Sequence, residues 1–162
     1  MTTTTVTTLP VDTIDATRIE ILEHAEDLFR HYGFGKTNMA DIASRCGMST
    51  GNLYRYYRNK QAIGLAVADQ FFVQSRNEIE TSLTGVTDPE QRIRTILGAS
   101  VDCKLREMTS SPKVMELIDF LVQAQEAQPL LQAFIAWKRD KVMAELERGM
   151  EQGAFKQMPL YG

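Results

Sequence analysis

Residues 33–64 read GFGKTNMADIASRCGMSTGNLYRYYRNKQAIG. Within this segment, Asn38 stands three residues before Asp41. That pairing is typical of a capped helix start, and it predicts a short helix that runs through about Cys46. Gly47 follows, and glycine ends helices readily because it adopts a left-handed backbone at no steric cost.

A second short helix is predicted directly after this turn. Ser49 is a favourable N-cap, and residues 50–56 follow it with the sequence TGNLYRY. Leu53 and Tyr57 are four residues apart and can face inward together. The remaining residues then face outward or sideways: Thr50, Gly51, Asn52, Tyr54, Arg55 and Tyr56. The two short helices and the turn between them form a helix-turn-helix.

The outward residues suit a helix that enters the major groove of DNA. Gly51 allows close backbone approach, Thr50 and Asn52 offer short hydrogen-bonding groups, and Arg55 can bind guanine or a phosphate. The two tyrosines can donate their hydroxyls to phosphates. The alternative is that the tyrosines are ordinary packing aromatics.

Basic residues gather in the same segment although the chain is acidic overall. The whole chain has 18 Lys+Arg and 21 Asp+Glu, a net charge of −3. Residues 36–60 hold five basic residues against the single acid Asp41, a local charge of +4 that leaves −7 elsewhere. Such a basic island is typical of a small element that contacts nucleic acid, although a solvated basic face has the same composition.

The periodicity outside this segment is helical throughout. Apolar residues recur every three or four positions over residues 15–32, and this helix ends at Gly33 and Gly35. A long helix is predicted from Lys60 to Leu83, capped by Asn59. Three further helices, each beginning at or near a proline, are predicted over residues 89–108, 112–125 and 129–152. With no strand pattern, the fold class is all-α.

Composition limits the protein class. The chain has 162 residues and is 43% hydrophobic, with no apolar run long enough to span a membrane and no signal-peptide pattern at its start. Cys46 and Cys103 cannot form a disulfide framework and fit a reducing cytoplasm. No catalytic motif is present, so we expect no enzyme and no cofactor. The predicted units are a disordered Thr-rich tail (1–12), a helix-turn-helix domain (13–60) and a helical effector-binding and dimerisation domain (61–162).

The segment from 15 to 64 resembles the DNA-binding region of TetR-family transcriptional regulators. The family pattern is met at Gly33-Phe34, Thr37, Ile42-Ala43, Gly47-Met48-Ser49, Gly51-x-Leu53-Tyr54, Tyr57 and Lys60. The resemblance implies a helix-turn-helix head followed by an antiparallel helical ligand-binding domain. It also implies a two-fold homodimer that binds a palindromic DNA operator and releases it when a small molecule binds.

Carried over by position, Thr37, Tyr54 and Lys60 match phosphate contacts of the family. The positions that vary with the operator are Thr50, Gly51, Asn52, Arg55 and Tyr56. With the cap residue Ser49, these form the set of DNA-binding candidates. Two positions depart from the pattern: Asn38 replaces a frequent Thr, and Tyr56 replaces a frequent His.

The C-terminal part departs from the family more strongly. Family members usually continue beyond the helix that ends near Gly153 into two long helices that form most of the dimer interface. Only AFKQMPLYG follows Gly153 in this sequence. We therefore expect those dimerisation helices to be lacking here, which makes dimerisation less secure than DNA binding.

The helices of the C-terminal half carry the candidate ligand contacts. Met108, Met115, Phe134 and Trp137 are candidates for lining an effector pocket, although apolar residues at helical spacing more often form core. Few polar groups accompany them, which favours an apolar or aromatic effector.

Glu20, His24, Asp27 and His31 share one helical face, where a metal site is conceivable but a solvated face with paired charges is favoured. The sequence thus predicts a ligand-responsive DNA-binding repressor with no metal. The alternative is a helical small-molecule-binding or interaction protein without useful DNA binding.

Overall fold

The computed structural model describes residues 11–110 and 112–156, and this part of the chain contains helices and no strand. The elements in order are α1 (Val11–Tyr32), α2 (Met39–Arg45), α3 (Thr50–Leu53), α4 (Lys60–Ser82), α5 (Pro89–Ser110), α6 (Val114–Gln123), the 3₁₀ turn η1 (Gln125–Ala127) and α7 (Gln128–Glu151). The predicted all-α fold class is confirmed. Among the described helices, none combines the length and the apolar character needed to cross a bilayer.

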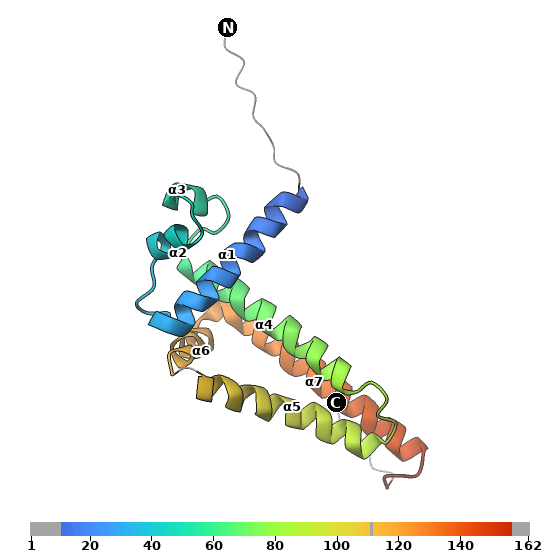
Figure 1. Cartoon of the computed structure of the whole chain (residues 1–162). Helices are drawn as coiled ribbons and strands as arrows, with labels where there is room; N and C mark the ends of the chain where they lie inside the picture. Colours follow the sequence, from blue (N-terminus) through green and yellow to red (C-terminus); the bar gives the residue numbers. More distant parts are fainter. Residues whose placement is uncertain (1–10, 111, 157–162) are drawn as a thin grey trace.

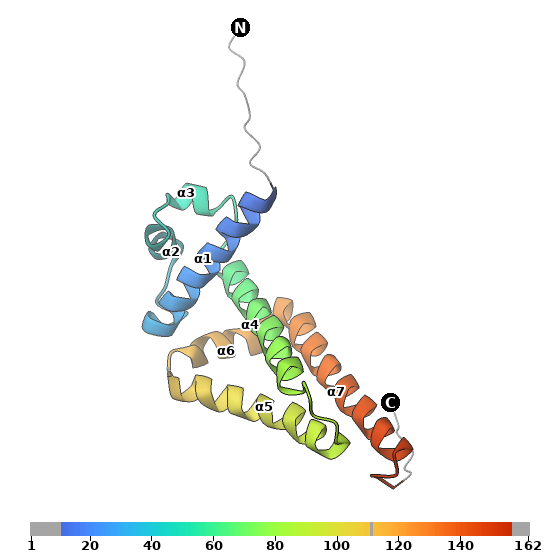
Figure 2. The same cartoon turned by 45° about the vertical axis from the view of Figure 1, so that its right-hand side comes forward.

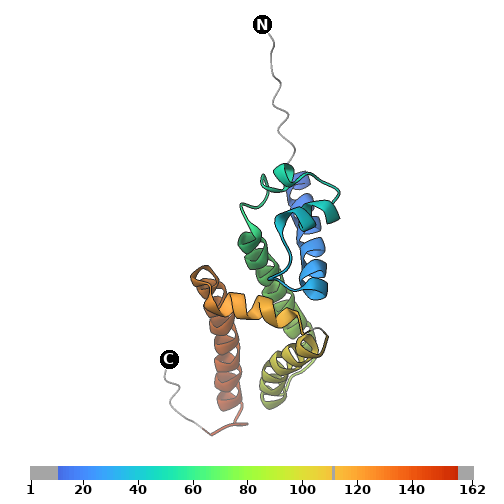
Figure 3. The ribbon, with the colours of Figure 1, turned by 90° about the vertical axis from the view of Figure 1, so that its left-hand side faces the viewer.

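The helices form a small head and a longer body (Figure 1). α1, α2 and α3 make the head, and α4 leads from it along the body beside α5 and α7 (Figure 2). α6 crosses the body just below the head, and Figure 3 shows it between the near ends of α5 and α7. α6 contacts α1 and α4 as well as α5, so it joins the head to the body.

The head is held together by one apolar core. α1 contributes Ile21, Ala25 and Phe29 at helical spacing, all almost completely buried. Ile42 of α2 and the first turns of α4 pack against this stripe. Burial of an Ile or Phe side chain contributes about 1.5–3 kcal/mol, and such burial is the main force that holds α2 and α3 on α1.

The body is fixed by a buried ionic cluster at its far end. The Nε atom of Arg92 in α5 donates to Glu145 of α7 at 2.6 Å, and Arg148 lies 3.1 Å from the same carboxylate. Arg92 also donates to the carbonyls of Leu83 and Val86 in the α4–α5 turn. The two guanidinium groups compensate the charge of Glu145, which explains why a carboxylate is buried here.

Several helix boundaries differ from the sequence prediction by one to four residues, three of them at α1, α3 and the start of α6. α1 begins at Val11 instead of residue 15, inside the predicted tail of residues 1–12. α3 ends at Leu53 and not near Tyr56, since the following amides bond to carbonyls three residues back in tight turns. α6 begins at Val114, two residues after the predicted start, because the preceding residues form a turn.

Candidate nucleic-acid interface and effector cavity

The turn between α2 and α3 is a compact helix C-cap. The Met48 amide donates to the Ala43 carbonyl at 2.9 Å and the Gly47 amide to the Ser44 carbonyl at 3.1 Å. These two bonds form a Schellman motif, which requires a left-handed residue at Gly47. Its φ of 64° confirms the predicted role of this glycine.

The capping residues predicted from the sequence are confirmed on both sides of the turn. At the start of α2, the Asn38 side chain accepts from the amides of Ala40 and Asp41, and the Asp41 side chain accepts from the Asn38 amide. At the start of α3, the Ser49 hydroxyl oxygen accepts from the Asn52 amide at 3.2 Å. The Ser49 side chain is exposed, and its hydroxyl proton is not used in the cap.

α3 is held by two inward side chains. Leu53 is completely buried in the head core, and Tyr57 is only 7% exposed. The guanidinium of Arg18 lies 5.3 Å from the centre of the Tyr57 ring. Burial raises the pKa of the Tyr57 hydroxyl, an effect that Arg18 opposes. Both inward positions agree with the sequence prediction.

The other α3 candidates form the outer face of the head. Gly51, Tyr54 and Arg55 are exposed, whereas Thr50, Asn52 and Tyr56 are partly covered. A Cβ atom built on Gly51 would meet no atom within 4 Å, so the backbone there borders open space. This face combines an accessible backbone, amide and hydroxyl groups, and a guanidinium, which are the groups that contact base edges and phosphates.

Two predicted phosphate contacts have other partners in the structure. Thr37 is 3% exposed, and its hydroxyl donates to the Gly33 carbonyl at 2.9 Å. The ammonium of Lys60 donates to the Phe34 carbonyl at 2.5 Å and the Gly35 carbonyl at 3.3 Å. Burial lowers the pKa of Lys60, while the carboxylate of Glu116 opposes this effect. Both side chains therefore stabilise the α1–α2 turn by hydrogen bonds to its backbone carbonyls.

The α1–α2 turn is the meeting point of head and body. The Phe34 ring stacks on Phe120 of α6, with centroids 4.5 Å apart, and lies edge-on to Phe29. Gly64 of α4 lies close to the same ring: a Cβ atom there would come within 2.8 Å of Phe34. The carboxylate of Glu116 accepts from the Gly35 amide at 2.9 Å. A movement of α6 would therefore act directly on the head.

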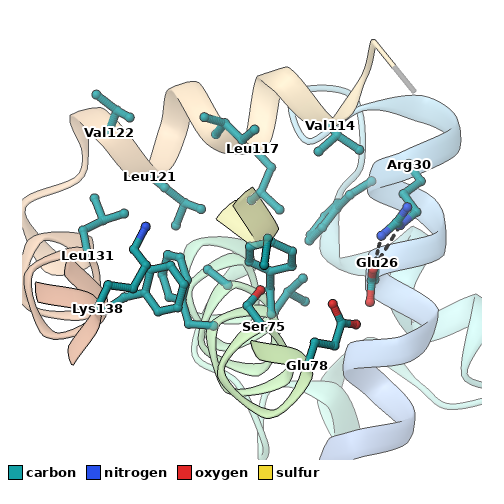
Figure 4. Close-up of a pocket in the computed structure, with 18 of the residues that line it drawn as sticks. Glu26, Arg30, Ser75, Glu78, Val114, Leu117, Leu121, Val122, Leu131 and Lys138 are labelled. Carbon is teal, nitrogen blue, oxygen red and sulfur yellow. Dashed lines mark hydrogen bonds and ion pairs between the residues drawn. The ribbon is translucent and has the colours of Figure 1, made fainter. Parts of the chain in front are cut away.

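A cavity of about 370 Å³ lies in the body beside α6. Its apolar wall comes from α4, α6 and α7, and Figure 4 shows Leu117, Leu121 and Leu131 on this wall. Phe71, Phe72 and Phe134 add aromatic surface. A mostly apolar cavity of this size suits a small organic molecule.

Of the four residues predicted to line the cavity, Phe134 is the one found among the described lining residues. Phe134 lines the cavity and stacks on Phe72 with centroids 4.8 Å apart. Trp137 stacks on Phe134 and packs against a neighbouring core. Neither Trp137 nor Met115 is among the described lining residues. The side chain of Met108 lies outside the part of the chain that the structure describes, as does that of Cys103.

Several residues that matter here were missed by sequence reasoning. Lys138 lines the cavity and stands four residues after Phe134 on the apolar stripe of α7. A cation within an apolar stripe is a signal that could have found it. No local sequence pattern marks Glu116 or Ser75, because the hydrogen-bond partner of Glu116 and the cavity residues around Ser75 come from distant parts of the chain.

The acidic and histidine stripe of α1 is a paired surface. His24 lies 3.9 Å from Glu20, and the His31 ring contacts the Asp27 carbonyl at 3.0 Å. Among the described residues, no three His, Cys, Asp or Glu side chains are grouped to hold a metal. Burial, with a smaller effect from Glu20, raises the pKa of the Cys46 thiol and disfavours the reactive thiolate.

Sequence comparison identifies the head. Residues 21–67 match the family model described as bacterial regulatory proteins, tetR family. The HTH-type transcriptional regulator YerO of Bacillus subtilis is 31% identical over 85 residues, which cover 51% of this chain and 29% of YerO. The aligned segments cover 29–40% of the curated relatives, so this chain matches well under two thirds of their length.

Structural comparison extends the likeness over the body. A TetR transcription regulator from Haloarcula marismortui superposes with a TM-score of 0.74 at 18% identity, covering 89% of this chain and 76% of that one. RolR in complex with resorcinol gives a TM-score of 0.65 at 20% identity, covering 93% of this chain and 72% of RolR. At these identities the likeness shows that head and body share the fold of those regulators.

Proposed function

Since the chain carries the N-terminal domain of the tetR family of bacterial regulatory proteins at residues 21–67, we propose that it is a sequence-specific, DNA-binding transcriptional regulator. The observation that carries the proposal is the outer face of α3. There Gly51 and Asn52 of α3, and Arg55 in the turn that follows it, lie on a segment that the buried side chains of Leu53 and Tyr57 anchor to the core.

The contacts divide into two groups. The first group, which meets base edges in the major groove, consists of residues of α3 and of the turn after it that are not buried in the core: Thr50, Gly51, Asn52 and Arg55. Ser49, Tyr54 and Tyr56 donate hydroxyl hydrogen bonds to phosphates on either side. Lys60 and Thr37 act indirectly, by holding the α1–α2 turn that carries α2 and α3.

The regulator is a cytoplasmic, ligand-responsive repressor that binds a palindromic operator as a homodimer. Support for the ligand response comes from α6, which lines the cavity with Leu117 and Leu121 and bonds to the head through Glu116. A molecule that displaces α6 thereby changes the position of the head. The apolar and aromatic wall of the cavity favours an effector with an apolar or aromatic body.

Titration of labelled DNA from the region upstream of the protein's own gene tests this proposal. A regulator binds one segment of that DNA at least about a thousandfold more tightly than scrambled DNA, and its affinity falls steeply with salt. Equal affinity for both DNAs would overturn the proposal. It would favour the second candidate, a small-molecule-binding protein that uses only the cavity.

A further inference from the structure

Ser75 is a polar residue on an apolar wall of the cavity. It stands between Phe72 and Ile79 on one face of α4, at spacings of three and four residues, and all three side chains line the cavity. Figure 4 shows Ser75 on the α4 side of the cavity, with Leu117 and Leu121 on the α6 side. The fold thus places one hydroxyl within a surface that is otherwise suited to an apolar ligand.

The hydroxyl of Ser75 has no hydrogen-bond partner among the described residues. A serine within a helix often donates to the carbonyl four residues before it, as Ser82 of α4 does to Glu78 at 2.8 Å. Ser75 makes no such bond to Phe71, although its side chain is only 7% exposed. A buried hydroxyl without a partner costs free energy that an alanine at the same position would avoid. The hydroxyl of Ser75 is therefore available to a molecule in the cavity.

The charged residues of the cavity lie to either side of Ser75. Figure 4 shows Lys138 on one side, and on the other Glu26, Arg30 and Glu78. Apart from these four, the described lining residues other than Ser75 are apolar. An ion is costly to bury when a neutral hydroxyl is its hydrogen-bond partner, so the ligand group that meets Ser75 is expected to be uncharged.

We infer that the cavity binds an uncharged, mainly apolar molecule that carries a hydroxyl group, and that Ser75 recognises this hydroxyl. A hydroxyl both donates and accepts, so it can pair with the serine hydroxyl in either direction. An analogue without the hydroxyl would leave Ser75 unpaired and would bind less well for that reason. The inference rests on the proposed function of the cavity as the effector site, and it adds the polarity of the effector and the residue that selects it.

A matched pair of probes tests recognition of the hydroxyl. β-Naphthol and β-methylnaphthalene have nearly the same shape and differ by a hydroxyl in place of a methyl group. The whole protein, as wild type and as Ser75→Ala, is titrated calorimetrically into each probe at neutral pH. We expect Ser75→Ala to bind β-naphthol about threefold to tenfold more weakly than the wild type, because one neutral hydrogen bond is lost. It should bind β-methylnaphthalene as tightly as the wild type or more tightly.

Three results of this titration would overturn the inference. They are an equal loss of affinity for both probes in Ser75→Ala, an affinity for β-naphthol that Ser75→Ala leaves unchanged, and no binding of β-naphthol to the wild type. Charged analogues add a fourth. β-Naphthoate and β-naphthylmethylammonium should each bind the wild type more weakly than β-naphthol, because each would bury an ion, and tighter binding of either one overturns the inference.

Ser82→Ala is the matched control for the substitution. Ser82 lies two turns further along α4, is exposed, and is not among the described lining residues. Ser82→Ala should bind both probes as the wild type does. Ser75→Ala should also keep a free energy of unfolding in urea at or above the wild-type value, because it removes an unpaired hydroxyl. A lower value would show that the fold itself uses the Ser75 hydroxyl, and would overturn the inference.

DNA release distinguishes this inference from the proposed function. Binding of β-naphthol that depends on Ser75 but never changes DNA affinity contradicts the proposed ligand response and supports the ligand chemistry. Release of DNA that Ser75→Ala leaves unchanged for β-naphthol contradicts the ligand chemistry and leaves the ligand response intact.

Discussion

The carboxylate of Glu116 accepts a hydrogen bond from the backbone amide of Gly35 at 2.9 Å, across 81 residues of sequence. Glu116 belongs to α6, whose Leu117 and Leu121 line the cavity. Gly35 belongs to the turn between α1 and α2 in the head. One hydrogen bond thus joins the helix that a ligand would touch to the element that a ligand response would have to move.

Stability should depend on pH through Glu116. The Gly35 amide, together with Lys113 and Lys36, holds the pKa of this carboxyl below its ordinary value of 4.5, although desolvation opposes them. A carboxyl with a lowered pKa stabilises the fold fully above its unfolded-state pKa and loses that contribution as pH falls through its folded-state pKa. In urea unfolding, Glu116→Ala should therefore have a lower free energy of unfolding than the wild type at neutral pH, and this difference should disappear in acid.

Glu116→Gln keeps an acceptor oxygen, so its free energy of unfolding should fall by less. A difference between Glu116→Ala and the wild type that is independent of pH would contradict this role of Glu116.

We expect Lys60 to stabilise the α1–α2 turn and not to contact a phosphate. Lys60→Met loses the donors to the Phe34 and Gly35 carbonyls and also the ammonium that lies 4.6 Å from the centre of the Phe34 ring. Loss of these bonds should lower the free energy of unfolding by about 1 kcal/mol, while the salt dependence of DNA binding stays unchanged. Arg58→Met, at an exposed position, is the control and should change stability by less than about 0.5 kcal/mol. If Lys60→Met reduces the slope of log affinity against log salt by about one ion, Lys60 contacts a phosphate and this prediction is wrong.

Gly51→Ala should leave the fold at least as stable and weaken DNA binding. The added Cβ meets no protein atom within 4 Å, and alanine is favoured over glycine in a helix by about 0.5–1 kcal/mol. Thermal unfolding should therefore show equal or greater stability. DNA affinity should nevertheless fall, because the methyl group occupies the space through which the backbone approaches the bases. Undiminished affinity would show that Gly51 does not face DNA.

Gly64→Ala should disturb the junction of α4, α6 and the head. The new Cβ would lie 2.8 Å from the Phe34 ring and 3.4 Å from Leu117 and Phe120. Overpacking of this kind costs about 1–3 kcal/mol, which urea denaturation can measure. Gly98→Ala in α5 makes the same change where nothing lies within 4 Å, and it should be neutral or stabilising. Equal effects of the two substitutions would contradict the close packing at Gly64.

The features that the sequence predicted well are set by neighbours in the chain. The Asn38 cap, the left-handed Gly47 and the Ser49 cap each depend on residues within five positions, so local pattern is sufficient to find them. The inward orientation of Leu53 and Tyr57 follows from helical spacing in the same way.

The features that escaped prediction depend on helices that meet only after folding. Lys60 has a long, flexible side chain that could point to DNA, and only the position of the α1–α2 turn shows that it bonds back to Phe34. The Glu116–Gly35 bond and the place of Lys138 in the cavity are set by the packing of α6 and α7. Trp137 likewise has the spacing of a pocket residue, but it stacks on Phe134 and is not among the described lining residues.

We propose that the face formed by α3 and the turn after it reads DNA sequence. Selection of preferred sites from random duplex DNA, carried out in parallel with wild type, Asn52→Ala and Arg55→Ala, measures whether it does. We expect the wild type to select a palindromic site. For each variant we expect relaxed preference at particular base pairs, with a loss of about 1–3 kcal/mol per base contact removed. A wild type that selects no site, or variants that select the wild-type site unchanged, would show that this face does not read DNA sequence.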